Sequence, residues 1–436
     1  MLLEFSVENY LSFKDIVTIS LVASKIKEYE ESNTLSFGKI KILKNAVIYG
    51  ANASGKSNLF KAMSFMRRFV HNSSKQTQVT EAIDIDTFKL STETNNAPSH
   101  FEIVFINEGI LYRYGFEVDH VKIHKEWLFY APKGVDVTLF TRIGSKIKLG
   151  SAFKEGKHLE NKTRENALFL SVAAQFNGTI AIKLLKWFNN FNIISGLKDY
   201  KAFTLKQLQD PSIKPLILDF LKIADLDIEE IYSETISVTK EGLPSEMPDS
   251  LKNLLLNQEF KTVNTHTQHK KYDENQHFVE METFNLDEQE SEGTKKLFSL
   301  AGPIFDTLNN GGALIVDELD AKLHPLITRF IIGLFYSQST NKHNAQLIFA
   351  THDISILSNK FFRRDQVWFT NKDKYGCTTL SSLVEYKEKE TKIRNDASYG
   401  KDYILGKYGA IPYVGDIEKL FPEKEEVEII ECKNKE

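Results

Sequence analysis

The chain has 436 residues, of which 42% are apolar and 26% charged, and its net charge is −4. The length is enough for two or three units, each with its own core, and the composition is typical of a globular protein. The net charge excludes a strongly basic overall surface of the kind that binds nucleic acid, although a local basic patch is compatible with it. The two distant cysteines, Cys377 and Cys432, argue against a disulfide framework or a zinc ribbon. Early Glu4 and Glu8 argue against a signal peptide, and no apolar run reaches the ~18 residues of a membrane span. We therefore expect a cytoplasmic protein with no membrane partner.

The N-terminal residues predict a β hairpin. Apolar and polar residues alternate from Met1 to about Val22, with a turn region at 10–15. A polar loop follows. The apolar run at 46–49 then predicts a buried strand, and helical spacing from residue 58 predicts a helix that ends near Val70.

The segment between this strand and this helix matches the phosphate-binding pattern G-x-x-x-x-G-K-S, the P-loop, without a mismatch. Gly50 and Gly55 let the backbone curl so that successive N–H groups point at phosphate oxygens. Lys56 reaches the β- and γ-phosphates, and the Ser57 hydroxyl ligates Mg²⁺. The alternative is an ordinary glycine-rich turn, but such a turn does not account for the predicted strand before the motif and the predicted helix after it. We therefore expect a nucleotide and Mg²⁺ to be bound by Gly50, Ala51, Asn52, Ala53, Ser54, Gly55, Lys56, Ser57 and Asn58.

The middle of the chain predicts two further units. Three alternating segments, 101–105, 111–118 and 123–130, predict an antiparallel sheet beside the P-loop core. From about Asn166 the pattern becomes mostly helical, with two alternating stretches near 259–286 that predict a hairpin. We interpret this region as a lobe inserted into the core. No heptad pattern is sustained, so no long coiled-coil arm is expected.

The C-terminal third returns to an α/β pattern. A predicted helix begins at Ser291, and apolar strands are predicted at 313–316, 346–350 and 366–369. Buried strands that alternate with helices predict a parallel sheet covered on both faces. The expected fold class is therefore α/β, with a mainly parallel P-loop core, an N-terminal antiparallel β subdomain and an inserted helical lobe. The expected boundaries are 1–165, 166–290, 291–385 and a tail at 386–436 that is a candidate partner-binding element.

Acidic residues and a histidine follow two of the predicted strands. Asp317 is placed to hold Mg²⁺, and Glu318 to polarise the attacking water. His352 ends the next strand, where a neutral imidazole can contact a γ-phosphate. Because the carboxyl ends of parallel strands line one crevice, we expect Gly50, Asp317 and His352 along the same edge. The alternatives without a functional role are that Asp317 and Glu318 are an ordinary surface pair and that His352 only caps a turn.

Ser291-Glu292-Gly293-Thr294 opens a predicted helix, and a helix N-terminus attracts anions. One interpretation is a plain N-cap with Ser291 as the capping residue. The other is a second phosphate-binding element, completed by another subunit. The residues alone leave both interpretations open.

The order of these motifs resembles that of ABC-type ATPases of the SMC/RecF kind. The resemblance implies that Ser291 and Gly293 form the signature motif, which binds the γ-phosphate of a second subunit. It implies that Asp320 belongs to the D-loop and that His352 is the switch histidine. It also implies that Gln175 is the Q-loop glutamine, which touches Mg²⁺. The resemblance extends to the N-terminal turn, where it implies adenine-side contacts from Phe13 and Lys14.

Within that class the chain resembles the compact prokaryotic AAA-family ATPases that lack coiled coils. The segments that carry this resemblance are 49–59, 317–325 and 395–399. Members resemble the ATPase half of two-gene anti-phage systems, either the AbiL type with an RloB-like nuclease or the PARIS type with a Toprim-fold effector. The resemblance therefore implies a head-to-tail homo-oligomer around ATP and Mg²⁺, with a separate effector.

Two other functions stay open at this point. A RecF-like DNA repair clamp would have duplex DNA as its main ligand and would bind it with a steep salt dependence. The net charge of −4 disfavours this function without excluding it. A transporter's ATP-binding subunit fits less well, because Ser-Glu-Gly-Thr replaces the usual Leu-Ser-Gly-Gly and no membrane segment is expected.

Overall fold

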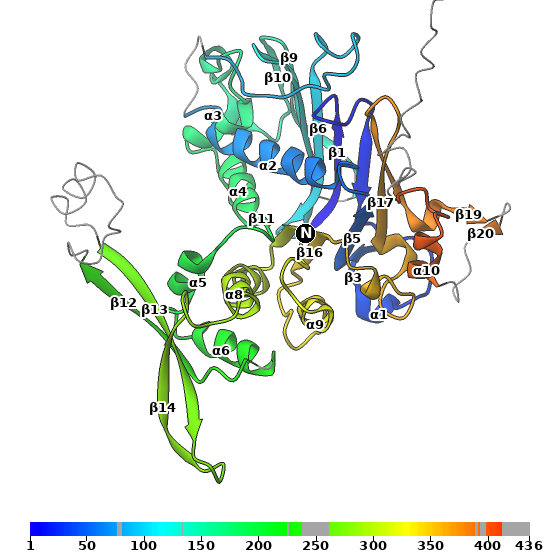
Figure 1. Ribbon diagram of the computed structural model, residues 1–436. Coiled ribbons are helices and arrows are strands. Elements are labelled where there is room, and N and C mark those ends of the chain that lie inside the picture. Colours follow the sequence, from blue (N-terminus) through cyan, green and yellow to red (C-terminus); the bar gives the residue numbers. More distant parts are fainter. Residues whose placement is uncertain are drawn as a thin grey trace, which may run out of the picture.

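The computed structural model describes residues 1–75, 81–132, 134–224, 226–237, 261–388, 391–392 and 398–411. Within these ranges the fold is α/β, with a central, mainly parallel sheet and an antiparallel sheet beside it (Figure 1). This arrangement confirms the predicted fold class. None of the helices in these ranges is both long and apolar enough to cross a membrane.

The central sheet carries the P-loop. Its strand order is β11-β15-β16-β5-β17-β18, in which the first five strands are parallel and β18 is antiparallel. Their bounds are β5 (Asn45–Gly50), β11 (Phe191–Ser195), β15 (Ala313–Asp317), β16 (Gln346–Ala350), β17 (Val367–Lys372) and β18 (Thr378–Ser382). Because the five strands are parallel, their carboxyl ends lie along one edge of the sheet.

Two hydrophobic cores cover the two faces of this sheet. On one face lie α2 (Lys56–Asn72), α4 (Thr179–Asn189) and the antiparallel sheet, and on the other lie α5 (Lys201–Gln207), α6 (Lys214–Ile223), α8 (Glu292–Asn310) and α9 (Pro325–Tyr336) (Figure 1). Strand β5 contributes to both cores. Ala46 and Ile48 belong to the first, whereas Val47 and Tyr49 belong to the second. This alternation is what a strand buried on both faces requires.

The antiparallel sheet has the order β10-β9-β8-β7-β6-β1-β2. The predicted N-terminal hairpin is confirmed, since β1 pairs with β2, and the three predicted central strands are β6, β7 and β8. The bounds are β1 (Leu2–Glu8), β2 (Val17–Ser20), β6 (Ser99–Asn107), β7 (Ile110–Val118), β8 (Ile123–Ala131), β9 (Val137–Ile143) and β10 (Lys146–Leu149).

The segment 166–290 is distributed differently from the expected inserted lobe. Helix α3 (Phe169–Gln175) is anchored to the antiparallel sheet, because the buried carboxylate of Glu126 accepts hydrogen bonds from the N–H groups of Phe169 and Leu170. Strand β11 is the edge strand of the central sheet, paired with β15. Only the part after β11 lies on the far face with α5 and α6.

The predicted hairpin exists and is part of a longer ribbon. Strand β13 (Lys261–Tyr272) pairs through its first half with β12 (Glu230–Ser237) and through its second half with β14 (Phe278–Asn285). The two pairings extend in different directions from the body (Figure 1). The remaining described elements are α1 (Glu30–Asn33), β3 (Thr34–Phe37), β4 (Ile40–Leu43), β19 (Lys387–Glu388), β20 (Thr391–Lys392), α10 (Tyr399–Ile404) and 3₁₀ turns at Lys154–Gly156, Glu160–Lys162, Ile354–Ile356, Arg364–Gln366 and Leu383–Glu385.

The tail predicted after residue 385 is described only in part. Helix α10 packs beside the central sheet, where the ring of Tyr403 lies 5.8 Å from that of Tyr49. Most of the 395–399 motif and all of 412–436 lie outside the described residues.

Candidate functional site

The P-loop lies between β5 and α2, as the motif requires. It lines a pocket of about 460 Å³ together with Glu318, His352 and Lys372, which we call the P-loop pocket. Its P-loop residues are Asn52, Ala53, Ser54, Gly55, Lys56, Ser57 and Asn58. Gly50 and Ala51 form the strand side of the loop, and the Ala51 carbonyl accepts a hydrogen bond from the Ser54 N–H at 3.2 Å.

Glycine is needed at both ends of the loop for steric reasons. At Gly50 a β-carbon would collide with Thr370 and Ser54, whose hydroxyl oxygens lie 2.6 Å apart. Gly55 has a φ of +110°, which residues other than glycine rarely adopt, and a β-carbon there would collide with Thr378. The loop is therefore held by strands β17 and β18 as well as by its own turns.

Lys56 is folded back onto its own loop. Its ammonium donates to the carbonyl oxygens of Gly50 at 2.7 Å and Ala51 at 3.0 Å, and the residue is buried. Burial lowers the pKa of Lys56, while the carboxylates of Asp317, Glu318 and Asp320 act in the opposite direction. Phosphate oxygens placed in the P-loop pocket would stabilise the charged form of this ammonium.

Ser12 and Thr378 connect the P-loop to two distant segments. The Thr378 hydroxyl lies 2.8 Å from Ser12 Oγ and 2.9 Å from the Ser54 carbonyl oxygen, and the Thr378 N–H donates to the Ser12 carbonyl at 2.7 Å. The Asn58 amide donates to Ser12 Oγ at 2.8 Å. Sequence reasoning did not assign Ser12 or Thr378. The only signal was that Ser12 precedes Phe13 in the N-terminal turn.

The structure contradicts the expected adenine-side contact of Phe13, whereas that of Lys14 stays a prediction. Phe13 is fully buried in the first core, because its side chain points inward from the turn, so it offers no face to a base. Lys14 forms an ion pair with Glu93 at 2.9 Å. A pocket of about 400 Å³ does adjoin the P-loop pocket, with Asn58 and Lys372 shared between them. Its other lining residues are Leu11, Ser12, Asp86, Thr87, Phe88, Lys89, Leu90 and Gly376.

Asp317, Glu318 and Asp320 lie at the carboxyl end of β15, on the same edge as the P-loop. Glu318 has a left-handed backbone (φ +57°) and lines the P-loop pocket. Asp317 Oδ1 is buried and has no hydrogen-bond partner among the described residues, and the same holds for Asp320 Oδ1. The other Asp320 oxygen accepts from the His352 N–H at 3.3 Å.

These residues fit Mg²⁺ of the kind that nucleotides carry. In the described ranges, no group of three or more His, Cys, Asp and Glu side chains could form a metal cage. Mg²⁺ does not need one, since it is bound by one or two protein oxygens together with phosphates and water. Ser57 in the P-loop pocket and the unpartnered Asp317 oxygen supply such ligands.

His352 follows β16 and lines the P-loop pocket opposite Lys56. Partial removal from water lowers the pKa of His352, and the nearby Lys56 ammonium lowers it further. The carboxylates of Asp320, Glu318 and Asp317 act in the opposite direction, but the net lowering of the pKa favours the neutral imidazole, in which one nitrogen can donate and the other can accept.

Ser291, which is exposed, and Gly293, which is half-buried, form a tip at the start of α8. Ser291 is the N-cap, and its Oγ accepts from the Thr294 N–H at 3.1 Å. Neither residue lines the P-loop pocket of its own chain. A β-carbon at Gly293 would meet only the Lys322 carbonyl at 3.5 Å and Ser291 Oγ at 3.7 Å, and its φ is not positive. The fold of this chain therefore does not itself require glycine at 293.

Gln175 is not brought to this site, contrary to the expectation for a Q-loop glutamine. Ser171 in the same helix, α3, donates to the carbonyl of Val70 near the C-terminal end of α2. That end lies roughly 20 Å along the helix from Lys56. Gln175 is exposed and does not line the P-loop pocket, because α3 packs on the wrong end of α2 for a contact with Mg²⁺.

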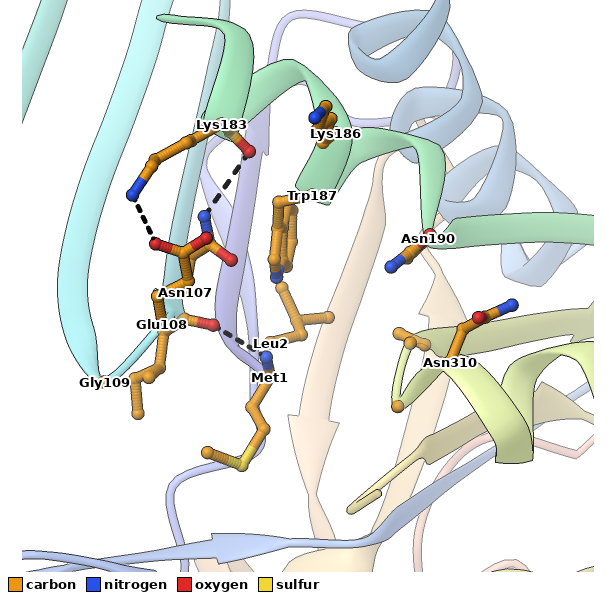
Figure 2. Close-up of a pocket in the computed structure, with 14 residues that line it drawn as sticks. Met1, Leu2, Asn107, Glu108, Gly109, Lys183, Lys186, Trp187, Asn190 and Asn310 are labelled. Carbon is orange, nitrogen blue, oxygen red and sulfur yellow. Dashed lines mark hydrogen bonds and ion pairs between the residues drawn. The ribbon is translucent and has the colours of Figure 1, made fainter. Parts of the chain in front are cut away.

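A separate pocket of about 350 Å³ lies at the opposite edge of the central sheet (Figure 2). It forms where the β6–β7 turn meets the C-terminal ends of α4 and α8, and Lys183 pairs there with Glu108 at 2.6 Å. Ala313, the first residue of β15, lines this pocket. It is thus one strand length away from Asp317 and belongs to a different part of the molecule.

Comparison with family models decides the family. Residues 46–358, more than half of the chain, match the family described as "AAA domain, putative AbiEii toxin, Type IV TA system". The chain belongs to this AAA-domain family. The match extends from the P-loop strand to just beyond His352, so it includes the P-loop, the Ser291–Gly293 tip and the Asp317–Glu318 pair.

The AAA-domain chain also has matches among solved structures. The SMC head domain from Thermotoga maritima shares 12% identity at a TM-score of 0.38, covering 87% of this chain and 98% of that one. An SMC head bound to the C-winged helix domain of ScpA shares 14% sequence identity at a TM-score of 0.40, covering 87% of this chain and 97% of that one. The recombination mediator protein RecF shares 12% sequence identity at a TM-score of 0.33, covering 87% of this chain and 98% of that one. A search of curated proteins gave no match.

Proposed function

We propose that the chain binds and hydrolyses Mg-ATP at a head-to-tail interface between two copies, and that this cycle controls a separate nuclease or Toprim-type effector in anti-phage defence. The observation that carries the proposal is the Ser291–Gly293 tip, at which Ser291 and Glu292 are exposed. It is an anion-attracting helix end with a glycine that its own chain does not need. Glycine is favoured where a ligand must approach the backbone closely, and a triphosphate held by a second copy is such a ligand.

The position of the tip supports the same proposal. Helix α8 runs antiparallel to β15, and its first turn is linked to the segment between β15 and α9 by the Glu292–Lys322 ion pair at 2.7 Å. The tip and the P-loop therefore face the same edge of the molecule while remaining separate. Exposed apolar residues follow the strands at this edge, namely Leu197 (69% exposed), Leu326 (64%) and Ile354 (38%). Covering them with a second copy would remove apolar surface from water.

Each residue in or beside the P-loop pocket has a separate role in the proposed reaction. Mg²⁺, held by Ser57 and Asp317, would neutralise charge on the phosphates. The P-loop N–H groups and Lys56 bind and orient the phosphates, and the base and ribose occupy the pocket shared through Asn58 and Lys372. Glu318 accepts a proton from the attacking water. The neutral His352 contacts the γ-phosphate and, through Asp320, responds to its loss.

The first test measures association. In Glu318→Gln, which should bind ATP without hydrolysing it, light scattering is expected to show dimers with Mg-ATP and monomers without it. Gly293→Val should abolish the ATP-dependent dimer. Gly333→Val is the matched control, because a β-carbon at Gly333 meets nothing within 4 Å and one at Gly293 makes only contacts of ordinary van der Waals length. Equal dimerisation of the two glycine variants would contradict the in-trans role of the tip.

The second test concerns the effector. The description of the family names a "putative AbiEii toxin" of a "Type IV TA system", which supports a function that depends on another gene product. We expect expression of the chain with its neighbouring gene to protect cells against phage, and the Lys56→Ala variant to lose protection. Protection that survives Lys56→Ala would separate the defence function from ATP.

A further inference from the structure

The segment 195–200, which is the last residue of β11 and the loop after it, lies between α8 and the turn that carries Glu318. It precedes α5, and sequence reasoning assigned it no role. Two sets of hydrogen bonds leave it, one toward the Asp317–Glu318 turn and the other toward α8.

The first set fixes the turn that carries Glu318. The Gly196 N–H donates to the Asp317 carbonyl at 2.5 Å, and Ser195 is paired with Asp317 in the parallel register of β11 and β15. A β-carbon at position 196 would collide with the Glu318 carbonyl oxygen. Glu318 itself has a left-handed backbone, which is unfavourable for a residue with a side chain and persists only where neighbours hold it. The loop therefore supports the backbone of the turn from which the Glu318 side chain projects.

The second set connects the loop to α8 through Tyr200. The Ser195 N–H donates to the Tyr200 hydroxyl oxygen at 2.8 Å, and the Tyr200 N–H donates to Ser299 Oγ at 2.6 Å. Ser299 is almost fully buried in α8, eight residues after the Ser291 cap and so roughly 12 Å along the helix. The Lys296 ammonium adds a third contact to the loop, at 3.2 Å from the Lys198 carbonyl oxygen.

We infer that Tyr200 is a positioning residue that couples the Ser291–Gly293 tip of a subunit to Glu318 of the same subunit. This inference rests on the proposed function. When the tip binds the nucleotide of the second copy, α8 moves as a rigid element, and Ser299, Tyr200 and Ser195 carry that movement to Gly196 and the Glu318 turn. Each active site then becomes competent only when the tip of its own subunit is engaged. The two ATP molecules of a dimer are hydrolysed interdependently.

The variant that tests this inference is Tyr200→Phe, which keeps the ring and removes the oxygen that accepts from Ser195. Net loss of one hydrogen bond corresponds to a rate change of about three- to tenfold. We expect kcat to fall by about that factor while the Kd for ATP, measured with the dimer-forming Glu318→Gln background, stays unchanged. Tyr386→Phe is the control, because its hydroxyl donates to the Tyr408 carbonyl at 3.0 Å outside this route. An unchanged kcat in Tyr200→Phe would overturn the inference.

Mixing two kinds of subunit gives a second test, because a residue that only stabilises the fold would not change how turnover depends on the partner subunit. In a mixed dimer with Lys56→Ala, the wild-type subunit holds ATP while its own tip faces an empty site. We expect excess Lys56→Ala to lower turnover per wild-type subunit several-fold and to leave the lower turnover of Tyr200→Phe subunits unchanged. An equal fractional loss in both would overturn the inference.

The outcomes also separate this inference from the function on which it rests. If Glu318→Gln does not dimerise with ATP, the proposed function fails and the coupling fails with it. If it dimerises and Tyr200→Phe behaves as wild type, only the coupling fails. A double variant, Ser299→Ala with Tyr200→Phe, should be no slower than the slower single variant, because both changes interrupt one route.

Discussion

Replacing Thr378 by valine tests whether the hairpin of β17 and β18 holds the P-loop in shape. Valine keeps the form of the side chain and removes a hydroxyl that lies 2.8 Å from Ser12 Oγ and 2.9 Å from the Ser54 carbonyl oxygen, at a residue only 1% exposed. A lost hydrogen bond costs about 1 kcal/mol, and leaving a buried partner unpaired adds about 1–2 kcal/mol. We expect the free energy of unfolding to fall by about 2–3 kcal/mol.

The same change should weaken nucleotide binding. Ser54 and Gly55 are in the part of the loop that Thr378 contacts, so a released loop must regain its shape when ATP binds. If about 1 kcal/mol of the lost energy opposes binding, the Kd for ATP rises roughly fivefold. Urea unfolding and isothermal titration calorimetry measure the two quantities.

Thr328→Val is the matched control. Thr328 is fully buried in α9, and its hydroxyl has no hydrogen-bond partner among the described residues. Valine there is expected to leave stability unchanged or to raise it by about 1 kcal/mol, with ATP affinity as in wild type. If the two valine variants unfold at the same urea concentration and bind ATP equally, the hairpin does not support the loop and this reasoning is refuted.

Three further predictions concern charged residues. Lys56→Ala should abolish ATP binding in calorimetry, and normal binding would refute its phosphate role. Glu318→Gln should keep ATP binding and slow steady-state phosphate release by roughly 10²–10⁴, so turnover at the normal rate would rule out Glu318 as the base. Burial lowers the pKa of Lys296 to about 8 from 10.5, so the buried charge destabilises the folded state fully below pH 8 and progressively less as the pH rises toward 10.5. Thermal unfolding should therefore show Lys296→Met more stable than wild type at pH 7, with the difference shrinking by pH 10; a difference that does not depend on pH would contradict this.

The sequence was sufficient where the signal is local. The P-loop, the apolar strand before it and the acidic pair after β15 are each contained in a short segment, and the parallel sheet follows from strands that alternate with helices. Strand β11 was missed because its apolar residues follow the helical run after only the Asn189–Asn190 pair, and they become a strand by pairing with β15.

The contacts around the P-loop that come from distant segments could not be predicted. Thr378 lies more than 300 positions from Ser54, and no pattern in either segment points to the other. Lys372 ends β17, three residues beyond the predicted strand 366–369, at the edge where Gly50 lies, so only an extension of that strand would have pointed to it. Gln175 and Phe13 were assigned by motif position alone, which specifies neither the end of α2 on which α3 packs nor the direction of the Phe13 side chain.

Strand β5 is hydrogen-bonded on both sides, to β16 and β17, and packs into both cores. Its amide protons can exchange with solvent only when both layers separate, which amounts to global unfolding. We therefore expect the P-loop to be attached to a slowly exchanging part of the molecule. Damage to either core, however remote from the P-loop, should register as a loss of protection in β5 and in β15 and β16, which are paired on both sides and contribute to both cores in the same way.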